Sequence, residues 1–281
     1  MAAYPDMSTQ LLRIIFDDWQ RATAEPDGVT YRQTELGGVP GLWITPTGCD
    51  QQRVLVVMHG GGFALGSSAS HRKMAGHMAK ACGAAAFVAD FRLAPEHPYP
   101  AAIEDGVAVL DALGAQGRAM SDITPVGDSA GGSVVIEMVL RLLAARRDLA
   151  REVITLSPWL NMENTGPTIE TNNDTDFLIT REGLQANIDR YLSGGASPTD
   201  PLVNPLYADL TGFPRLYICV SDSESLFDDS LRLRGLAEKC GVDVTLSIGR
   251  GQQHVYPIQA GRHAAADAEI AAIAAWYARG R

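Results

Sequence analysis

Short apolar runs alternate with longer stretches of helical spacing along most of the chain. The apolar runs predict strands at 29–36, 41–44, 53–58, 84–89, 123–126, 153–156, 215–220 and 242–248. Helical patterns lie between them, at 71–81, 101–113, 129–145, 226–240 and 264–279. Strands that alternate with crossover helices predict an α/β fold: a mostly parallel, eight-stranded sheet with helices on both faces. The first two strands have no helix between them, so we expect an antiparallel start.

One long polar segment, residues 161–201, interrupts this alternation. It is rich in Asn, Thr, Gly and Asp and has a single helical stretch at 181–192. The segment is too long for a simple connection, and long loops of this kind are usually functional. With an amphipathic N-terminal helix at 9–21, it predicts a small helical cap over the carboxyl edge of the sheet, formed by about 1–25 and 161–201. A solvated surface excursion is the alternative.

Composition and charge narrow the class of protein. The 281 residues are 46% hydrophobic and 20% charged, which is typical of a globular chain, and α/β folds of this length often form a single domain. The net charge of −10 repels phosphate backbones, so we expect no nucleic-acid partner. No apolar run approaches the ~18 residues of a membrane span, and the N-terminus lacks the basic start of a signal peptide. With no CxxC spacing among the cysteines, these features predict a cytoplasmic protein.

A Gly-Asp-Ser-Ala-Gly segment at 127–131 follows a predicted strand and opens a predicted helix. A serine at so sharp a turn takes a strained backbone conformation, and its neighbours must be small to avoid collision. Ser129 would then project from the turn with its hydroxyl near the positive end of the helix. We predict Ser129 as a nucleophile, the alternative being a purely structural turn.

A run of three glycines at 60–62 directly follows the predicted strand at 53–58. Glycines leave the backbone free to aim amide groups at the negative charge that forms when a serine attacks a carbonyl. We assign Gly61, Gly62 and the amide of Ala130 to this oxyanion hole. A phosphate-binding loop is the alternative, but the segment has neither the GxGxxG nor the P-loop spacing. His59 is expected to brace the loop by hydrogen bonding.

A serine nucleophile needs a base, and the base needs an acid to orient it. In folds with this strand–turn–helix nucleophile, the acid and then the base come later in the chain. His254 lies in the loop at 249–256 that directly follows the last predicted strand, whereas His263 stands at the edge of the terminal helix. We therefore predict His254 as the base.

The acid is expected after the strand at 215–220, where four carboxylates compete. Asp228 and Asp229 fit the early turns of the helix at 226–240, where they would interact with its dipole. Asp222 and Glu224 remain, and local chemistry leaves both open.

Several separate segments resemble, in the same order, the hormone-sensitive lipase-like family of α/β-hydrolase esterases. They include His-Gly-Gly-Gly-Phe at 59–63, Asp-Phe-Arg-Leu-Ala-Pro-Glu-His-Pro at 90–98, Gly-Asp-Ser-Ala-Gly-Gly at 127–132, Asp-Pro-Leu at 200–202 and Gln-His-Val at 253–255. The family's usual acid lies in an Asp-Pro-Leu-x-Asp pattern, which aligns with Glu-Ser-Leu-Phe-Asp at 224–228. The chain departs from it by Glu for Asp and Ser for Pro. Because this resembles a Glu-bearing branch, the acid is placed at Glu224, with Asp222 as the fallback.

The resemblance implies a serine carboxylesterase that hydrolyses small esters with short acyl chains through an acyl-enzyme, without a metal or organic cofactor. It also implies a helical cap, and a loop near the site anchored by Arg92 and Glu96. A lactone hydrolase or an amidase or deacetylase would use the same residues. A non-catalytic ligand-binding receptor of the same fold is a further alternative.

Substrate-contacting residues are less evident from the sequence. Phe63, Trp159 and Phe177 are candidates for the wall of the substrate pocket, because each lies near the expected carboxyl edge of the sheet. Aromatic residues at such positions also belong to the core of many proteins. The exposed outer helices and the edge strand leave a homodimer open.

Overall fold

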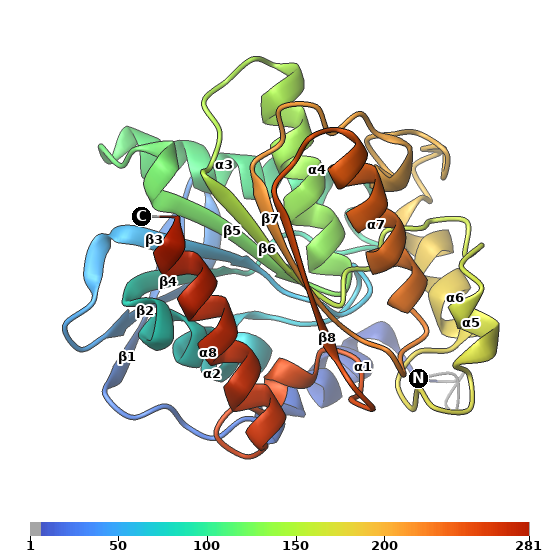
Figure 1. Cartoon of the computed structure of the whole chain (residues 1–281), viewed down its shortest axis with the longest axis horizontal. Coiled ribbons are helices and arrows are strands. Elements are labelled where there is room, and N and C mark those ends of the chain that lie inside the picture. The colour runs from blue at the N-terminus through green and yellow to red at the C-terminus, as the bar shows by residue number, and fades with distance from the viewer. Residues whose placement is uncertain (1–6, 281) are drawn as a thin grey trace.

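A computed structural model describes residues 7–280, in which eight strands form one sheet in the order β1-β2-β4-β3-β5-β6-β7-β8 (Figure 1). The strands are β1 (Val29–Leu36), β2 (Val39–Pro46), β3 (Asp50–Met58), β4 (Ala84–Ala89), β5 (Ile123–Asp128), β6 (Glu152–Leu156), β7 (Arg215–Ser221) and β8 (Val244–Gly249). Strand β2 is antiparallel to both of its neighbours, and all other pairs are parallel. The predicted sheet and its antiparallel start are therefore confirmed.

Helices cover both faces of this sheet. They are α1 (Thr9–Asp17), η1 (Asp18–Ala22), α2 (Ser68–Cys82), α3 (Ala101–Ala115), η2 (Met120–Asp122), α4 (Ala130–Ala144), α5 (Thr168–Thr171), α6 (Arg181–Tyr191), η3 (Pro205–Tyr207), α7 (Phe227–Lys239), η4 (Tyr256–Gln259) and α8 (Ala264–Arg279). Helices α2 and α8 pack on one face and share one apolar cluster (Figure 1). Helices α3, α4 and α7 cover the other face, where a second cluster includes residues of α6.

The central strands are apolar along their length because helices cover them from both sides. Every residue of β4 is buried, and residues 54–58 of β3 are at most 1% exposed. The parallel strands all end at the same edge of the sheet. The loops that follow β3, β5, β6, β7 and β8 therefore meet there, which is where ligands bind in open α/β sheets.

Element boundaries differ from the predicted ones where local hydrogen bonds decide them. Strand β2 is longer than predicted because it pairs with β1 along its whole length, from Val29 opposite Pro46 to Leu36 opposite Val39. Helix α2 begins at Ser68, earlier than the apolar pattern indicated, because a capping box starts it. Strand β8 begins at Val244, since the amide of Val242 bonds to the carbonyl of Ala237 in the last turn of α7.

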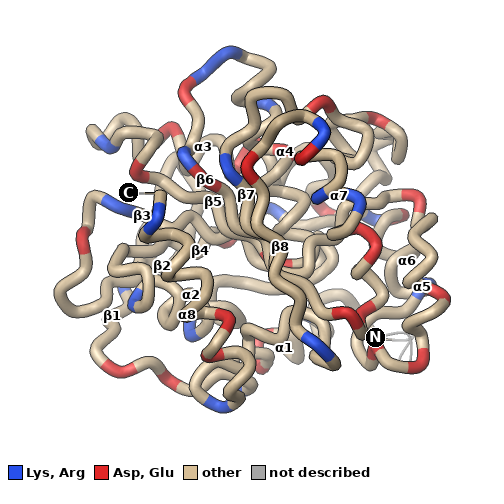
Figure 2. Tube along the Cα trace, in the orientation of Figure 1, with Lys and Arg blue, Asp and Glu red and all other residues tan. Residues whose placement is uncertain are grey.

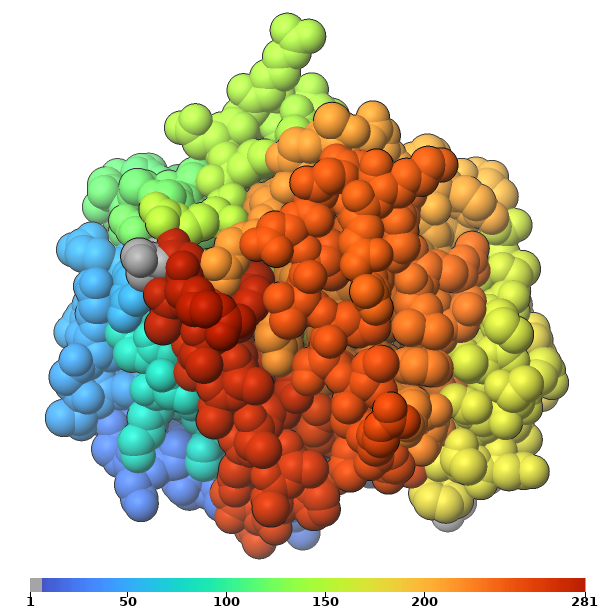
Figure 3. Space-filling model, viewed as in Figure 1, coloured from blue at the N-terminus to red at the C-terminus, as the bar shows by residue number. Residues whose placement is uncertain are grey.

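Residues 161–201, here called the polar insertion, contain α5 and α6 and pack directly beside the segment around α7 (Figure 3). Lys and Arg residues are dispersed along the chain and interspersed with Asp and Glu (Figure 2). None of the helices within residues 7–280 has the length and apolar character needed to cross a bilayer.

Candidate active site

Ser129 stands at the turn between β5 and α4. Its φ of 51° and ψ of −122° form a conformation that residues with side chains rarely adopt. Its amide donates to the carbonyl of Leu156, the last residue of β6, at 2.9 Å, and its carbonyl accepts from the amide of Trp159, in the loop after β6, at 3.0 Å. A Cβ at Gly131 would lie 1.9 Å from the Met58 carbonyl oxygen, so this position admits only glycine.

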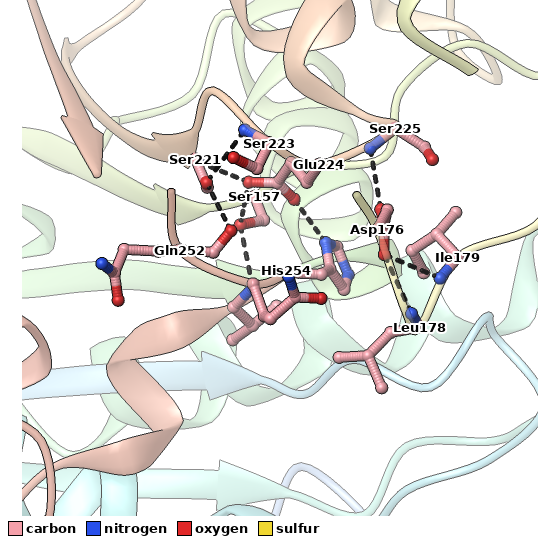
Figure 4. Close-up of polar contacts among 12 residues, drawn as sticks. Ser157, Asp176, Leu178, Ile179, Ser221, Ser223, Glu224, Ser225, Gln252 and His254 are labelled. Atoms are coloured by element: carbon pink, nitrogen blue, oxygen red, sulfur yellow. Dashed lines mark hydrogen bonds and ion pairs between the residues drawn. The ribbon is translucent and has the colours of Figure 1, made fainter. Parts of the chain in front are cut away.

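His254 and Glu224 meet at the same edge of the sheet, from the loops after β8 and β7. Nδ1 of His254 lies 2.5 Å from Oε2 of Glu224 (Figure 4). The two side chains are 6% and 0% exposed, respectively. A carboxylate that accepts the Nδ1 hydrogen leaves Nε2 of the neutral imidazole as the free acceptor. The structure thus brings the predicted base and the predicted acid into direct contact.

The second oxygen of Glu224 is held as firmly as the first. Oε1 accepts hydrogen bonds from the Ser157 hydroxyl at 2.8 Å and from the Ser221 amide at 2.6 Å (Figure 4). Oγ of Ser157 also accepts from the Val255 amide at 3.0 Å. Ser157 therefore joins the loop after β7 (residues 222–226), here called the acid loop, to the loop after β8 (residues 250–255) that carries His254. Sequence reasoning missed this residue, although its place directly after β6 was a usable signal.

The protonation of His254 is set by two opposing effects. Burial alone lowers the pKa of His254, but the hydrogen bond and negative charge of Glu224, with the charges of Asp176 and Asp128, together raise the pKa above its ordinary value. Nε2 of His254 is buried, and among residues 7–280 it has no hydrogen-bond partner. This nitrogen is available to a group that enters from the adjoining cavity.

Ser129 and His254 both line a cavity of about 310 Å³. Most of its other walls are apolar and come from α1, η1 and the polar insertion: Leu12, Ile15, Phe16, Trp19, Leu178, Ile179 and Leu184. Gly61 and Gly62 line the same cavity. Four of the residues predicted to carry the chemistry therefore face one small, mainly apolar space.

The predicted oxyanion loop follows β3. Gly61 and Gly62 have φ angles of 120° and 63°, values that glycine adopts without strain. Within residues 7–280, neither of their amides has a hydrogen-bond acceptor. Ala130 is the first residue of α4, and amides of a first helical turn have no partner inside the helix. These three amides are thus free to bind an oxygen.

Asp128, which directly precedes Ser129, ties the glycine loop to the serine turn. Its Oδ1 accepts the Gly60 amide at 3.1 Å, and its Oδ2 lies 3.2 Å from Nε2 of His71. Burial opposes ionisation here, but the charge and hydrogen bond of His71 outweigh it and lower the pKa of Asp128. A buried carboxylate therefore fixes the position of the loop relative to Ser129.

His59 lies at the start of this loop and away from the cavity. Its Nδ1 is 2.8 Å from the Gly60 carbonyl oxygen, and its ring stacks on Phe91 with centroids 4.3 Å apart. Burial, with a smaller contribution from neighbouring His71, lowers the pKa of His59 to about 4. His59 is therefore neutral at pH 7, and its contacts suit the bracing role predicted for it.

Arg92 and Glu96, expected to anchor a loop near the site, do so through different partners. The Nε of Arg92 lies 2.9 Å from Asp105 Oδ1, within the same part of the chain. Glu96 instead forms an ion pair of 2.7 Å with Arg13 of α1. Nε of Arg13 also donates to the carbonyl of Ala64, just after the glycine loop, at 2.8 Å. Glu96 thereby helps to hold α1 against the site.

The three aromatic pocket candidates have different surroundings. Trp159 and Phe177 line the cavity, and Phe177 is 81% exposed at its rim. Phe63 does not line the cavity, contrary to the prediction. Its φ of 61° accompanies burial of the ring, which stacks on Tyr191 of α6 at 3.7 Å between centroids. Phe63 is therefore a core contact between the glycine loop and the polar insertion.

The other carboxylates near the acid loop have partners elsewhere. Oδ1 of Asp222 accepts the Gly251 amide at 2.8 Å, so this side chain is engaged at the surface and not at His254. Asp229 lies in the first turn of α7 as predicted, but it is buried and accepts the amides of Leu160 and Asn161 at 2.8 and 2.9 Å. Burial raises the pKa of Asp229 to about 6. Its main role is therefore to hold the loop after β6.

Similarity to known proteins agrees with this architecture. A family model for the alpha/beta hydrolase fold matches residues 55–258. An acetyl-hydrolase of Streptomyces hygroscopicus is 34% identical over 244 residues, which cover 87% of this chain and 81% of that protein. An esterase of Acinetobacter venetianus is 35% identical over 246 residues, covering 88% and 81% of the two chains. The crystal structure of an esterase from the bacterial hormone-sensitive lipase family matches with a TM-score of 0.95 at 35% identity, covering 99% of this chain and 94% of that chain.

A mostly parallel sheet with a serine on the sharp turn after β5 defines the class as an α/β hydrolase. Within that class, the chain belongs to the bacterial hormone-sensitive lipase-like family of carboxylic ester hydrolases. The family and the enzyme class predicted from the sequence are therefore confirmed.

Proposed function

We propose that the protein is a serine carboxylesterase in which Ser129 is the nucleophile, His254 the base and Glu224 the acid. The observation that carries this proposal is the contact of 2.5 Å between Glu224 and His254 beside a cavity that Ser129 also lines. His254 Nε2 takes the proton of the Ser129 hydroxyl as its oxygen attacks the ester carbonyl. Glu224 keeps the imidazole in the required tautomer and stabilises the imidazolium.

The attack places a negative charge on the carbonyl oxygen of the substrate. In this proposal, the amides of Gly61, Gly62 and Ala130 donate hydrogen bonds to that oxygen, and each such donor is typically worth about 3–4 kcal/mol. The imidazolium then gives its proton to the departing alcohol, leaving an acyl group on Ser129. Water, activated by His254, attacks the acyl group and releases the acid.

The size of the cavity supports small esters with short acyl chains. Its volume of about 310 Å³ is at the lower end of the range for ligand pockets, and its walls are largely apolar. The similarity to an acetyl-hydrolase supports acetyl esters as the first substrates to test. Lactones and amides could be attacked by the same groups, and matched lactone, ester and anilide substrates would rank them.

The N-terminal segment and the polar insertion together act as a cap in this proposal. Helix α1, η1 and residues 177–184 supply much of the cavity wall, so the cap restricts which substrates reach Ser129. Part of the predicted N-terminal cap, residues 1–6, lies outside the described residues. A cytoplasmic location and a homodimer remain predictions; sedimentation of the purified protein would test the second.

Labelling with a fluorophosphonate probe tests the proposal, because such probes react with activated serines. We expect the wild-type protein to hydrolyse acetyl esters and to carry the label on Ser129. Ser129→Ala should lose both properties while keeping its fold, as judged by circular dichroism. Equal labelling of wild type and Ser129→Ala would refute Ser129 as the nucleophile.

A further inference from the structure

The loop between α5 and α6 is bonded directly to the acid loop. Nδ2 of Asn172 donates to the carbonyls of Asp222 at 3.0 Å and Glu224 at 2.9 Å. The hydroxyl of Thr175 donates to the carbonyl of Ser223 at 2.8 Å. This part of the polar insertion therefore contacts the backbone on both sides of the carboxylate that binds His254.

Asp176 is the centre of this junction (Figure 4). Its side chain is buried, and its Oδ2 accepts the amide of Ser225, the residue after Glu224, at 2.7 Å. Its Oδ1 accepts the amides of Leu178 at 2.9 Å and Ile179 at 3.0 Å, two residues that line the cavity. One carboxylate thus holds the acid loop with one oxygen and the cavity wall with the other.

We infer that Asp176 is a positioning residue that couples the wall of the substrate cavity to the Glu224–His254 pair and adds a further negative charge that acts on the imidazole. The inference rests on the proposed function and goes beyond it, since it gives a cap residue a part in setting the acid and the base. Asp176 need not touch the substrate; it acts through Glu224 and His254.

The backbone of the acid loop suits this role. Ser225 stands where the Asp-Pro-Leu-x-Asp pattern has proline, and a proline would offer no amide to Asp176. The two oxygens of Asp176 accept three backbone amides, those of Leu178, Ile179 and Ser225, and amides bond more strongly to a carboxylate than to a neutral acceptor. The departure from the pattern at position 225 supplies one of these three donors.

The charge of Asp176 acts on His254 together with two other carboxylates. Glu224 of the acid loop bonds to the imidazole directly, and the negative charges of Asp176 in the polar insertion and Asp128 at the end of β5 also act on it. All three raise the pKa of His254, while burial lowers it. The imidazolium that forms during proton transfer is therefore stabilised by more than one carboxylate.

The pH profile of kcat/KM for an acetyl ester tests the inference, with Asp176→Asn as the variant. An amide has one acceptor oxygen, so it cannot replace both carboxylate oxygens, and it carries no charge. We expect the plateau to fall by about 10-fold to 100-fold, because small displacements of catalytic groups are costly. We expect the acid limb to move to lower pH by about half a unit, because a negative charge has been removed.

Asp174→Asn is the matched control, because it removes the same charge from an exposed position in the same loop. It should leave both the plateau and the acid limb at their wild-type values. Asp176→Glu keeps the charge and changes the reach, so it should lower the plateau and leave the acid limb in place. Ser225→Pro, which removes the amide donor and leaves the charge of Asp176 in place, should also lower the plateau and leave the acid limb in place.

An Asp176→Asn profile that matches Asp174→Asn would overturn the inference. A lower plateau in Asp176→Asn without a shift of the acid limb would also overturn it, because a purely structural residue would give that result. Should Asp176→Asn fail to fold, wild-type plateaus for both Asp176→Glu and Ser225→Pro would overturn it instead. The His254 ring titration followed by NMR needs no substrate and should show the same shift. If the wild-type protein hydrolysed no ester, the proposed function would be refuted, and the NMR titration of His254 would still test the inference.

Discussion

The two walls of the cavity are built in different ways. On the sheet side, backbone packs against backbone: a Cβ at Gly127 would lie 2.1 Å from the Gly131 carbonyl oxygen, and a Cβ at Gly131 would lie 1.9 Å from the Met58 carbonyl oxygen of β3. On the side of the polar insertion, side chains reach across to backbone groups, as Asn172 and Asp176 do to the acid loop. The first wall tolerates no added atom, whereas the second depends on individual hydrogen bonds.

Because of this difference, the residues proposed to carry the chemistry and the residues expected to select the substrate are held in place by different kinds of contact. The serine turn is held by the sheet, through the carbonyl of Leu156 and the close approach of Gly131 to Met58, and Asp128 ties the glycine loop to that turn. The acid loop lies between the two walls, since Glu224 contacts Ser157 after β6 and its backbone accepts from Asn172. Substitutions in the insertion should therefore tune the reaction, and substitutions at the sheet edge should abolish it.

The largest effect is expected from Glu224→Gln. An amide at this position holds His254 in the wrong tautomer, and loss of the equivalent charge in a serine triad costs about 10⁴-fold in kcat. Asp222→Asn is the matched change in the same loop and should alter kcat little, because Asp222 bonds to Gly251. Steady-state kinetics on an acetyl ester compares them. A large loss in Asp222→Asn with a small one in Glu224→Gln would move the acid to Asp222.

The packing of the sheet side can be broken with one methyl group. Gly131→Ala places a Cβ against the Met58 carbonyl, so we expect the free energy of unfolding to fall by about 3 kcal/mol or more. Gly114→Ala in α3 is the control, because nothing lies within 4 Å of its Cβ position. That change should stabilise the protein by about 0.5–1 kcal/mol, as alanine favours a helix. Urea unfolding measures both, and equal stabilities would contradict the close packing.

The hydrogen bonds of the polar insertion should contribute less to the free energy of unfolding than the close packing at Gly131 does. Asn172→Ala removes two hydrogen bonds that Asn172 donates to carbonyls of the acid loop. We expect a loss of about 1–2 kcal/mol in unfolding free energy with a modest fall in kcat. Asn173→Ala, at an exposed neighbouring position, should change neither quantity. Thermal unfolding and kinetics on the same samples would compare them. Indistinguishable variants would mean that the insertion is held by other contacts.

The smallest effect concerns pH and needs no substitution. His254 acts as a base only when neutral, and Glu224 raises its pKa above the ordinary value of about 6.5. As pH falls through that raised pKa, the imidazole becomes protonated and kcat/KM should decline. The acid limb of the profile should therefore lie above pH ~6.5. A limb well below that value would show that burial outweighs the carboxylates around His254.

Much of the sheet side could be predicted from the sequence, because its signals are local. Apolar runs indicated every strand, and the positions of Ser129 directly after β5 and of His254 in the loop after β8 placed both at one edge. The terminal helix at 264–279 has the predicted bounds, since its apolar spacing is regular to the end. These patterns arise from burial, and each short stretch of sequence shows its own pattern of apolar and polar residues.

The side of the insertion could not be predicted to the same extent. Asp176 binds an amide 49 positions away in the chain, and no spacing rule relates the two. Ser157 was missed because its value depends on Glu224, which comes from another loop. Phe63 was wrongly expected in the pocket, because a left-handed backbone at that residue was not evident from its type. Hydrogen bonds between distant loops leave little trace in local sequence.

The most direct measurement of the central claim is rapid-quench mass spectrometry during hydrolysis of an activated acetyl ester. We expect one acetyl group on the peptide that contains Ser129, formed before steady state and absent from Ser129→Ala. We also expect Glu224→Gln to form it far more slowly. Acetylation of a different residue, or turnover by Ser129→Ala at the wild-type rate, would contradict the account.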